Sequence, residues 1–98
     1  MDLAELTTAM HRFVKARGWY APDSPKPQSP RNLASSLVIE AAEVLELFQW
    51  SEEAPKNDAL ASELADVALY LLQLASISNI DLEQAILNKL ENNYDRAW

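Results

Sequence analysis

The chain has 98 residues, of which 49% are hydrophobic and 23% charged, and its formal net charge is −7. This length predicts one small domain spanning residues 1–98, and the composition is globular rather than disordered. The chain has no cysteine, which excludes disulfides, cysteine-based zinc sites and thiol nucleophiles. The acidic balance argues against binding to a nucleic-acid polymer, because such binding needs a basic face.

The N-terminal residues do not resemble a signal peptide, and the longest uncharged run, Val67 to Ile80, is shorter than the ~20 residues that a membrane-spanning helix needs. We therefore expect a soluble, cytoplasmic protein without a membrane partner. A core of this size is marginal when it stands alone, so burial between subunits would add stability.

The first helix is predicted over residues 3–17. Asp2 is a candidate N-cap with Glu5 three residues later, and basic residues followed by Gly18 are typical of a helix end. A proline-rich loop follows. Ser29 and Pro30 then resemble an N-cap and a first helical position, so we predict the second helix over residues 30–50.

Residues 51–58 are polar and predict a turn, and the third helix is expected over residues 58–78. From Leu64 to Ile77 this helix is apolar nearly all round, which is typical of a buried helix. One short chain can hardly cover it, so we expect a homo-oligomer. Asp81 and Gln84 predict the start of a fourth helix over residues 82–94. The fold class is therefore all-α: a four-helix subunit whose bundle is completed by oligomerisation.

Two pairs of acids interrupt the apolar helices: Glu40 and Glu43 in the second, and Glu63 and Asp66 in the third. Residues three apart share a helix face. A short turn makes the two helices antiparallel neighbours, and counting along the chain leaves a height mismatch of only ~3 Å at ~1.5 Å per residue. This offset would set Glu43 opposite Glu63, and Glu40 opposite Asp66.

Four carboxylates gathered in this way repel one another unless a cation lies between them. All-oxygen ligands suit Mg²⁺ or Mn²⁺. Di-iron chemistry is disfavoured, because the single histidine, His11, has no glutamate three residues before it. The alternative is that the acids bind no metal and are ordinary solvated carboxylates on the helix surfaces.

The acid pattern, with nineteen residues between Glu43 and Glu63, resembles the metal motif of the all-α nucleoside triphosphate pyrophosphohydrolases, the MazG-like superfamily. The sequence around the acid pattern is similar to that of the dCTP pyrophosphatase branch. It includes the segments Pro30–Leu33, Leu45–Trp50, Glu63–Tyr70 and Lys89–Asn93 with Arg96.

The resemblance implies hydrolysis of a (deoxy)nucleoside triphosphate, with dCTP or a modified dCTP favoured, to the monophosphate and pyrophosphate, as nucleotide pool sanitation. It implies a homodimer or homotetramer. By the same resemblance, metal would be held by Glu40, Glu43, Glu63 and Asp66, phosphate by Lys89 and Asn93, and the base by Trp19, Trp50 and Tyr70. Arg96 is a further basic residue placed to reach phosphate. His11 lies one place from the position of a histidine that helps to form the base pocket in the dCTP pyrophosphatase branch, and is our further candidate for a base contact.

Glu43 is our candidate for the catalytic base that takes the proton of an attacking water. Lys89 and Asn93 are an i,i+4 pair on one helix face. His11 has the alternative of being a packed or surface histidine. Two other functions stay open: a pyrophosphohydrolase of different or broader base preference, and a non-catalytic helical interaction module.

Overall fold

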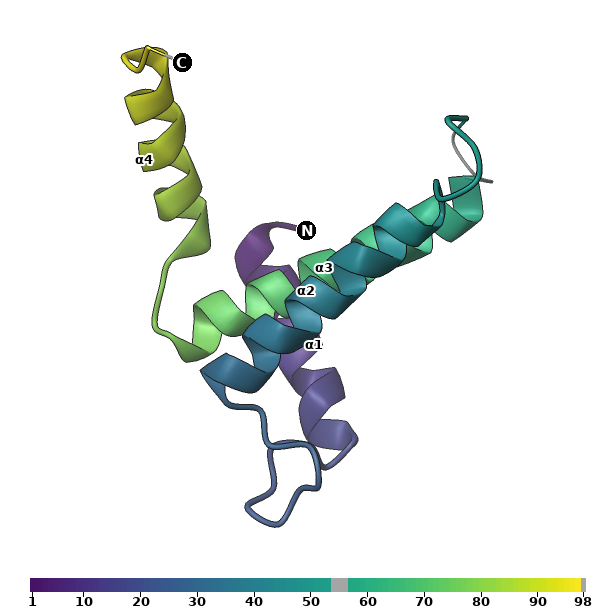
Figure 1. The fold of residues 1–98 in the computed structure, drawn as a ribbon. Coiled ribbons are helices and arrows are strands. Elements are labelled where there is room, and N and C mark those ends of the chain that lie inside the picture. The colour runs from purple at the N-terminus through teal and green to yellow at the C-terminus, as the bar shows by residue number, and fades with distance from the viewer. Residues whose placement is uncertain (54–56, 98) are drawn as a thin grey trace.

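A computed structural model of the chain describes residues 1–53 and 57–97, so part of the predicted turn at 51–58 lies outside the described residues. The described residues form four helices and no strand, as the all-α prediction requires (Figure 1). The helices are α1 (Leu3–Ala16), α2 (Pro30–Glu46), α3 (Asn57–Ile77) and α4 (Leu82–Tyr94).

Three of the helices begin at the predicted caps. Asp2, Ser29 and Asp81 have extended backbones, and each side chain accepts a hydrogen bond from the backbone N–H three residues later. Such a cap satisfies an N–H group that has no partner inside its helix. Pro30 follows Ser29 at the first turn, where its missing N–H costs nothing.

Two helices end in the same way. After α1, Gly18 has a φ of +77°, its N–H donates to Lys15 O, and the N–H of Trp19 donates to Val14 O. After α3, Asn79 has a φ of +58°. Its N–H donates to Ser76 O, and the next N–H, that of Ile80, donates to Ala75 O. Both patterns are Schellman motifs, in which a left-handed residue reverses the chain and satisfies the last carbonyls.

Helix α2 ends at Glu46, four residues before the predicted end at Trp50. The chain tightens here: Leu47, Phe48 and Gln49 each donate their backbone N–H to the carbonyl three residues earlier. Such tightening is common at a helix terminus, and the apolar pattern continues through it, so periodicity alone did not show where the α-helix stops.

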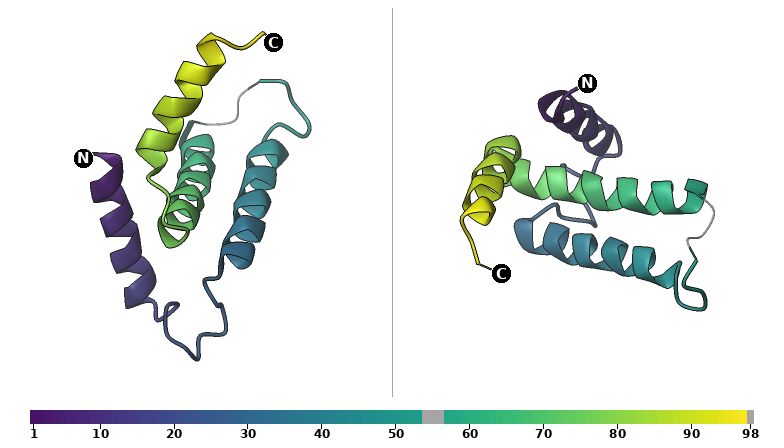
Figure 2. Two further views of the ribbon diagram at one scale, coloured as in Figure 1. Left: turned by 90° about the vertical axis from the view of Figure 1, so that its left-hand side faces the viewer. Right: turned by 90° about the horizontal axis from the view of Figure 1, so that it is seen from above.

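Helix α3 is the central element. Helices α2 and α3 run side by side and antiparallel, α1 packs on α3, and α4 projects from the C-terminal end of α3 (Figures 1 and 2). Among the described residues the buried apolar side chains are few: Met10, Val14, Leu33, Leu72 and Ala75. On α3 itself, Leu64 is 50% and Leu69 42% exposed. One chain therefore leaves much of its central apolar helix uncovered.

By length and composition alone, α3 is also long and apolar enough to cross a membrane, because its most apolar stretch has a mean hydropathy of 1.4. The core helix of a soluble protein has a similar length and composition but is mostly buried, whereas 17% of this stretch of α3 is buried within one chain. Glu63 and Asp66 lie in this helix, and carboxylates are costly within a bilayer. Their position beside the acids of α2 favours a core helix over a membrane span.

Candidate metal and nucleotide site

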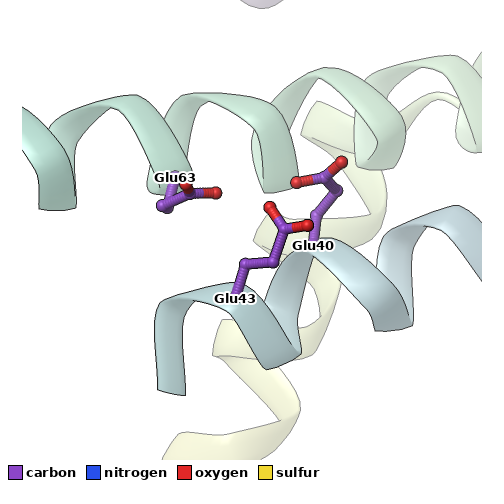
Figure 3. Close-up of side chains that lie close together, drawn as sticks. All are labelled: Glu40, Glu43 and Glu63. Carbon is purple, nitrogen blue, oxygen red and sulfur yellow. The ribbon is translucent and has the colours of Figure 1, made fainter. Parts of the chain in front are cut away.

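Three carboxylates converge between α2 and α3. Glu40 and Glu43 come from successive turns of one face of α2, and Glu63 comes from the facing side of α3 (Figure 3). Each offers a carboxylate oxygen, and these oxygens all lie within 4.8 Å of one another. The antiparallel pairing of the two helices therefore gathers acids that are far apart in the sequence, as the helix offset predicts.

Asp66 lies next to this cluster. It contributes to raising the pKa of both Glu40 and Glu63 through its negative charge, and it lines the same cavity as Glu40. All four acids that the sequence singles out are thus close enough to act on one another electrostatically. We call Glu40, Glu43, Glu63 and Asp66 the acid cluster.

The acid cluster is electrostatically strained. Burial, hydrogen bonding to Glu43 and the surrounding negative charges raise the pKa of Glu40 to about 7. The pKa of Glu63 is also raised, first by its hydrogen bond to Glu43, which needs a proton on one of the two carboxylates, and then by desolvation and its acidic neighbours. Without a counter-charge, Glu40 and Glu63 hold protons more tightly than ordinary carboxylates do.

The oxygens of the acid cluster fit a divalent cation. Glu40 Oε2 and Glu63 Oε2 are both buried and have no hydrogen-bond partner in the structure. Burying a carboxylate oxygen in this way is unfavourable unless something pairs with it. A hard cation such as Mg²⁺ or Mn²⁺ takes oxygen ligands of this kind and removes the repulsion.

A largely apolar cavity of about 420 Å³ opens beside the acid cluster, between α1 and α3. Glu40 and Asp66 lie on its wall, and so do two of the predicted base-contacting aromatics, Trp19 and Tyr70. The remaining wall is apolar apart from Gln73, and consists of Leu6, Ala9, Met10, Phe13, Val14 and Leu69. We call this space the aromatic cavity.

Trp19 is held by its neighbours. The Phe13 ring meets it edge to face, with centroids 5.7 Å apart. Lys26 Nζ and Arg17 Cζ lie 5.2 and 5.6 Å from the centroid of the Trp19 ring, within cation–π range. The loop between α1 and α2 is thereby tied to the wall of the aromatic cavity.

His11 makes contacts within the chain that the sequence did not predict. It is absent from the wall of the aromatic cavity, and its ring nitrogens pair with Tyr20 and Ser76: Nδ1 lies 2.6 Å from Tyr20 Oη and Nε2 lies 2.7 Å from Ser76 Oγ. A direct contact between His11 and a base stays an untested prediction. Sequence reasoning also missed Gln73, because nothing in the helical pattern marks it beyond one polar residue in an apolar run.

The other predicted contacts, Trp50, Lys89, Asn93 and Arg96, do not line the aromatic cavity. Trp50 is 89% exposed and makes little contact with the rest of the chain. Lys89, Asn93 and Arg96 belong to α4 or follow it, and α4 is attached to the C-terminal end of α3, whereas Glu63 and Asp66 lie in its N-terminal half. Asn93 Oδ1 is buried and lacks a hydrogen-bond partner in the structure.

Known proteins share both the sequence and the fold. A dCTP pyrophosphatase 1 from Rattus norvegicus is 42% identical over 76 residues, covering 68% of this chain and 45% of that protein. The dCTP pyrophosphatase 1 of Homo sapiens matches with the same identity and coverage. The chain thus spans about half the length of these relatives.

A crystal structure of a pyrophosphatase from Archaeoglobus fulgidus matches the fold with a TM-score of 0.78 and 35% sequence identity, covering 92% of this chain and 86% of that one. The profile of the MazG-like family matches residues 35–97, which include the whole acid cluster. The chain therefore belongs to the MazG-like family.

Proposed function

We propose that residues 1–98 form a single catalytic domain, a Mg²⁺-dependent nucleoside triphosphate pyrophosphohydrolase. Its substrate would be dCTP or a modified dCTP, converted to the monophosphate and pyrophosphate. The observation that carries the proposal is the acid cluster, with two buried carboxylate oxygens that lack partners, at the wall of an aromatic cavity. The names of the dCTP pyrophosphatase relatives and of the archaeal pyrophosphatase support the reaction class.

In this reaction a water oxygen attacks the α-phosphorus, and the bond from that phosphorus to the bridging oxygen of pyrophosphate breaks. Mg²⁺ or Mn²⁺, held by Glu40, Glu43, Glu63 and Asp66, would neutralise phosphate charge and polarise the phosphoryl group. Glu43 accepts the proton of the attacking water. Phosphoryl transfer needs positioning and charge neutralisation more than covalent help, which suits a site built from carboxylates.

The aromatic cavity would receive the base. Trp19 and Tyr70 offer ring faces and edges, and stacking on an aromatic ring is worth ~1–3 kcal/mol per base. The triphosphate would extend toward the acid cluster, because Glu40 and Asp66 belong to both features. The phosphate contacts would come from Lys89, Asn93 and Arg96.

We also propose that the working form is a soluble homodimer or homotetramer. Support comes from the apolar side chains that one chain leaves exposed, on α3 and also on α4, where Ile86, Leu87 and Leu90 are each more than two-fifths exposed. A second copy would cover them, and it could bring Trp50 and the α4 residues to a neighbouring site.

The decisive experiment is a panel of common and modified nucleoside triphosphates assayed for pyrophosphate release with Mg²⁺ and with EDTA. The proposal predicts turnover of a cytosine deoxynucleotide, loss of turnover with EDTA, and equal amounts of monophosphate and pyrophosphate. Folded protein that turns over no triphosphate would refute it.

A further inference from the structure

Gln73 is a polar side chain in an apolar place. It lies on α3, is only 3% exposed, and forms part of the wall of the aromatic cavity. Burying an amide is unfavourable unless it is hydrogen-bonded. Its Nε2 lies 2.7 Å from Gln28 Oε1 and 3.2 Å from Tyr20 Oη, so the amide is tied to the loop between α1 and α2.

The orientation of this amide follows from one backbone carbonyl. Lys26 O can only accept, and it accepts from Gln28 Nε2 at 2.7 Å. Gln28 must therefore present its Oε1 to Gln73, which fixes the nitrogen of Gln73 toward Gln28. The same nitrogen donates its second hydrogen to Tyr20 Oη.

The network continues beyond Tyr20. Tyr20 Oη also pairs with His11 Nδ1, and His11 Nε2 pairs with Ser76 Oγ. With both of its N–H groups used, Gln73 can offer the aromatic cavity only its carbonyl oxygen.

We propose that Gln73 is a specificity-determining residue, whose fixed carbonyl oxygen selects bases that carry an exocyclic amino group. The inference rests on the proposed function in placing a base in the aromatic cavity. Cytosine and adenine present an amino group at the edge where uracil and hypoxanthine present a carbonyl. An amino group donates to Gln73 Oε1, whereas a carbonyl oxygen would meet another acceptor.

Gln28 is the positioning residue for this selection. To accept a keto base, the Gln73 amide would have to rotate by half a turn. The rotation would break its hydrogen bond to Gln28 and would place two amide oxygens against each other. A free amide could adapt to either base. The discrimination therefore depends on the hydrogen bond from Gln73 Nε2 to Gln28 Oε1, which fixes the orientation of the amide and which we call the lock.

The test measures equilibrium binding by calorimetry, with two pairs of product-like nucleotides that differ in amino against keto: dCMP with dUMP, and dAMP with dIMP. We expect the wild-type protein to favour the amino member of at least one pair by about tenfold, the value of one well-made hydrogen bond. Gln73→Leu should weaken the binding of the amino nucleotide by about tenfold and bring the ratio of amino to keto affinity near one. Gln84→Leu, the same change at an exposed position of α4, is the matched control and should leave the ratio unchanged.

Gln28→Leu and Gln28→Glu test the lock without altering the buried position. Leucine frees the Gln73 amide, so keto nucleotides should bind more tightly and the ratio should fall to about threefold or less. Glutamate still accepts from Gln73 Nε2 and should keep the ratio. These loop variants decide the matter if Gln73→Leu fails to fold.

The outcomes separate the two claims. If no nucleoside triphosphate is hydrolysed but the amino preference is present and lost in Gln73→Leu, the proposed function fails and the role of Gln73 stands. If triphosphates are hydrolysed but the preference is absent, survives in Gln73→Leu, or is unchanged in Gln28→Leu, the role of Gln73 is wrong. Failure of the wild-type protein to bind any of the four nucleotides also overturns it.

Discussion

Glu40 on α2 and Glu63 on α3 bring carboxylate oxygens within 4.8 Å of each other, and each has an Oε2 that is buried without a hydrogen-bond partner. Two negative groups in this relation destabilise the fold that brings them together. Some favourable interaction must offset this repulsion, and the chemistry of the two carboxylates supports the binding of a cation between them.

The acid cluster predicts opposite effects of one substitution with and without metal. In EDTA, Glu40→Gln should stabilise the protein, by about 1 kcal/mol at most, because it removes a repelled charge from a partly exposed site. With Mg²⁺ present, the variant should lose most of the metal-induced rise in Tm that the wild-type protein shows. Differential scanning fluorimetry over a Mg²⁺ titration measures both effects.

Glu83→Gln is the control for this prediction, because Glu83 lies in the first turn of α4 and is not a member of the acid cluster. It should respond to Mg²⁺ as the wild-type protein does. If Glu40→Gln and Glu83→Gln gave the same metal response, the cluster would not be the metal site.

The pH dependence of stability has a sign fixed by the raised pKa of Glu40, about 7 against an ordinary value of 4.5. The folded state binds this proton more tightly than the unfolded state does. In the metal-free protein, Glu40 therefore favours the folded state at low pH, and this contribution to the free energy of unfolding is lost as pH rises from about 4.5 to about 7. Urea unfolding in EDTA across this range measures the trend.

With saturating Mg²⁺ the trend should reverse over the same range, because cation binding requires ionised carboxylates. In the metal-free protein the raised pKa of Glu63 acts in the same direction as that of Glu40. Metal-free stability that rises between pH 5 and pH 7 would contradict this account of the cluster.

Glu43→Gln should reduce turnover by about 10²–10⁴-fold, because an amide cannot take a proton from water. Glu43 is also a proposed metal ligand, so the metal affinity of the variant must be measured alongside, by calorimetry. A loss of turnover that persists at saturating Mg²⁺ supports the proton-accepting role. Turnover within a few-fold of wild type would remove Glu43 from it.

The two Schellman motifs predict a pair of backbone effects. At Gly18 a Cβ atom would meet nothing within 4 Å, so Gly18→Ala should cost only the strain of its positive φ, about 1–2 kcal/mol. Asn79→Gly should be neutral or slightly stabilising for the same reason, whereas Asn79→Ala should destabilise. Chemical denaturation compares the three variants, and equal effects of glycine and alanine at position 79 would contradict the prediction.

The local rules that predicted the fold act within a few residues. The caps at Asp2, Ser29 and Asp81 mark three helix starts, and α4 has the predicted bounds of 82–94. The meeting of Glu40, Glu43 and Glu63 also followed from local information, since a short turn between two helices leaves little freedom in their relative height.

What the sequence did not predict depends on longer-range packing. The path of the loop through Gln28 and Tyr20 decides how the Gln73 amide is oriented, and no periodic pattern describes such a path. The same is true of His11, whose partners Tyr20 and Ser76 lie on different segments. The direction of α4 is set by the single turn around Asn79, so helical periodicity gave no information about it.

The central claim is that a cation belongs between Glu40, Glu43 and Glu63. The most direct measurement is a crystal grown with Mn²⁺ and a non-hydrolysable deoxynucleoside triphosphate, with anomalous diffraction recorded for manganese. The account predicts an anomalous peak that places a Mn²⁺ ion within bonding distance of oxygens of these three carboxylates, with the base in the aromatic cavity. Nucleotide bound elsewhere, or a cluster with no peak at saturating Mn²⁺, would contradict it.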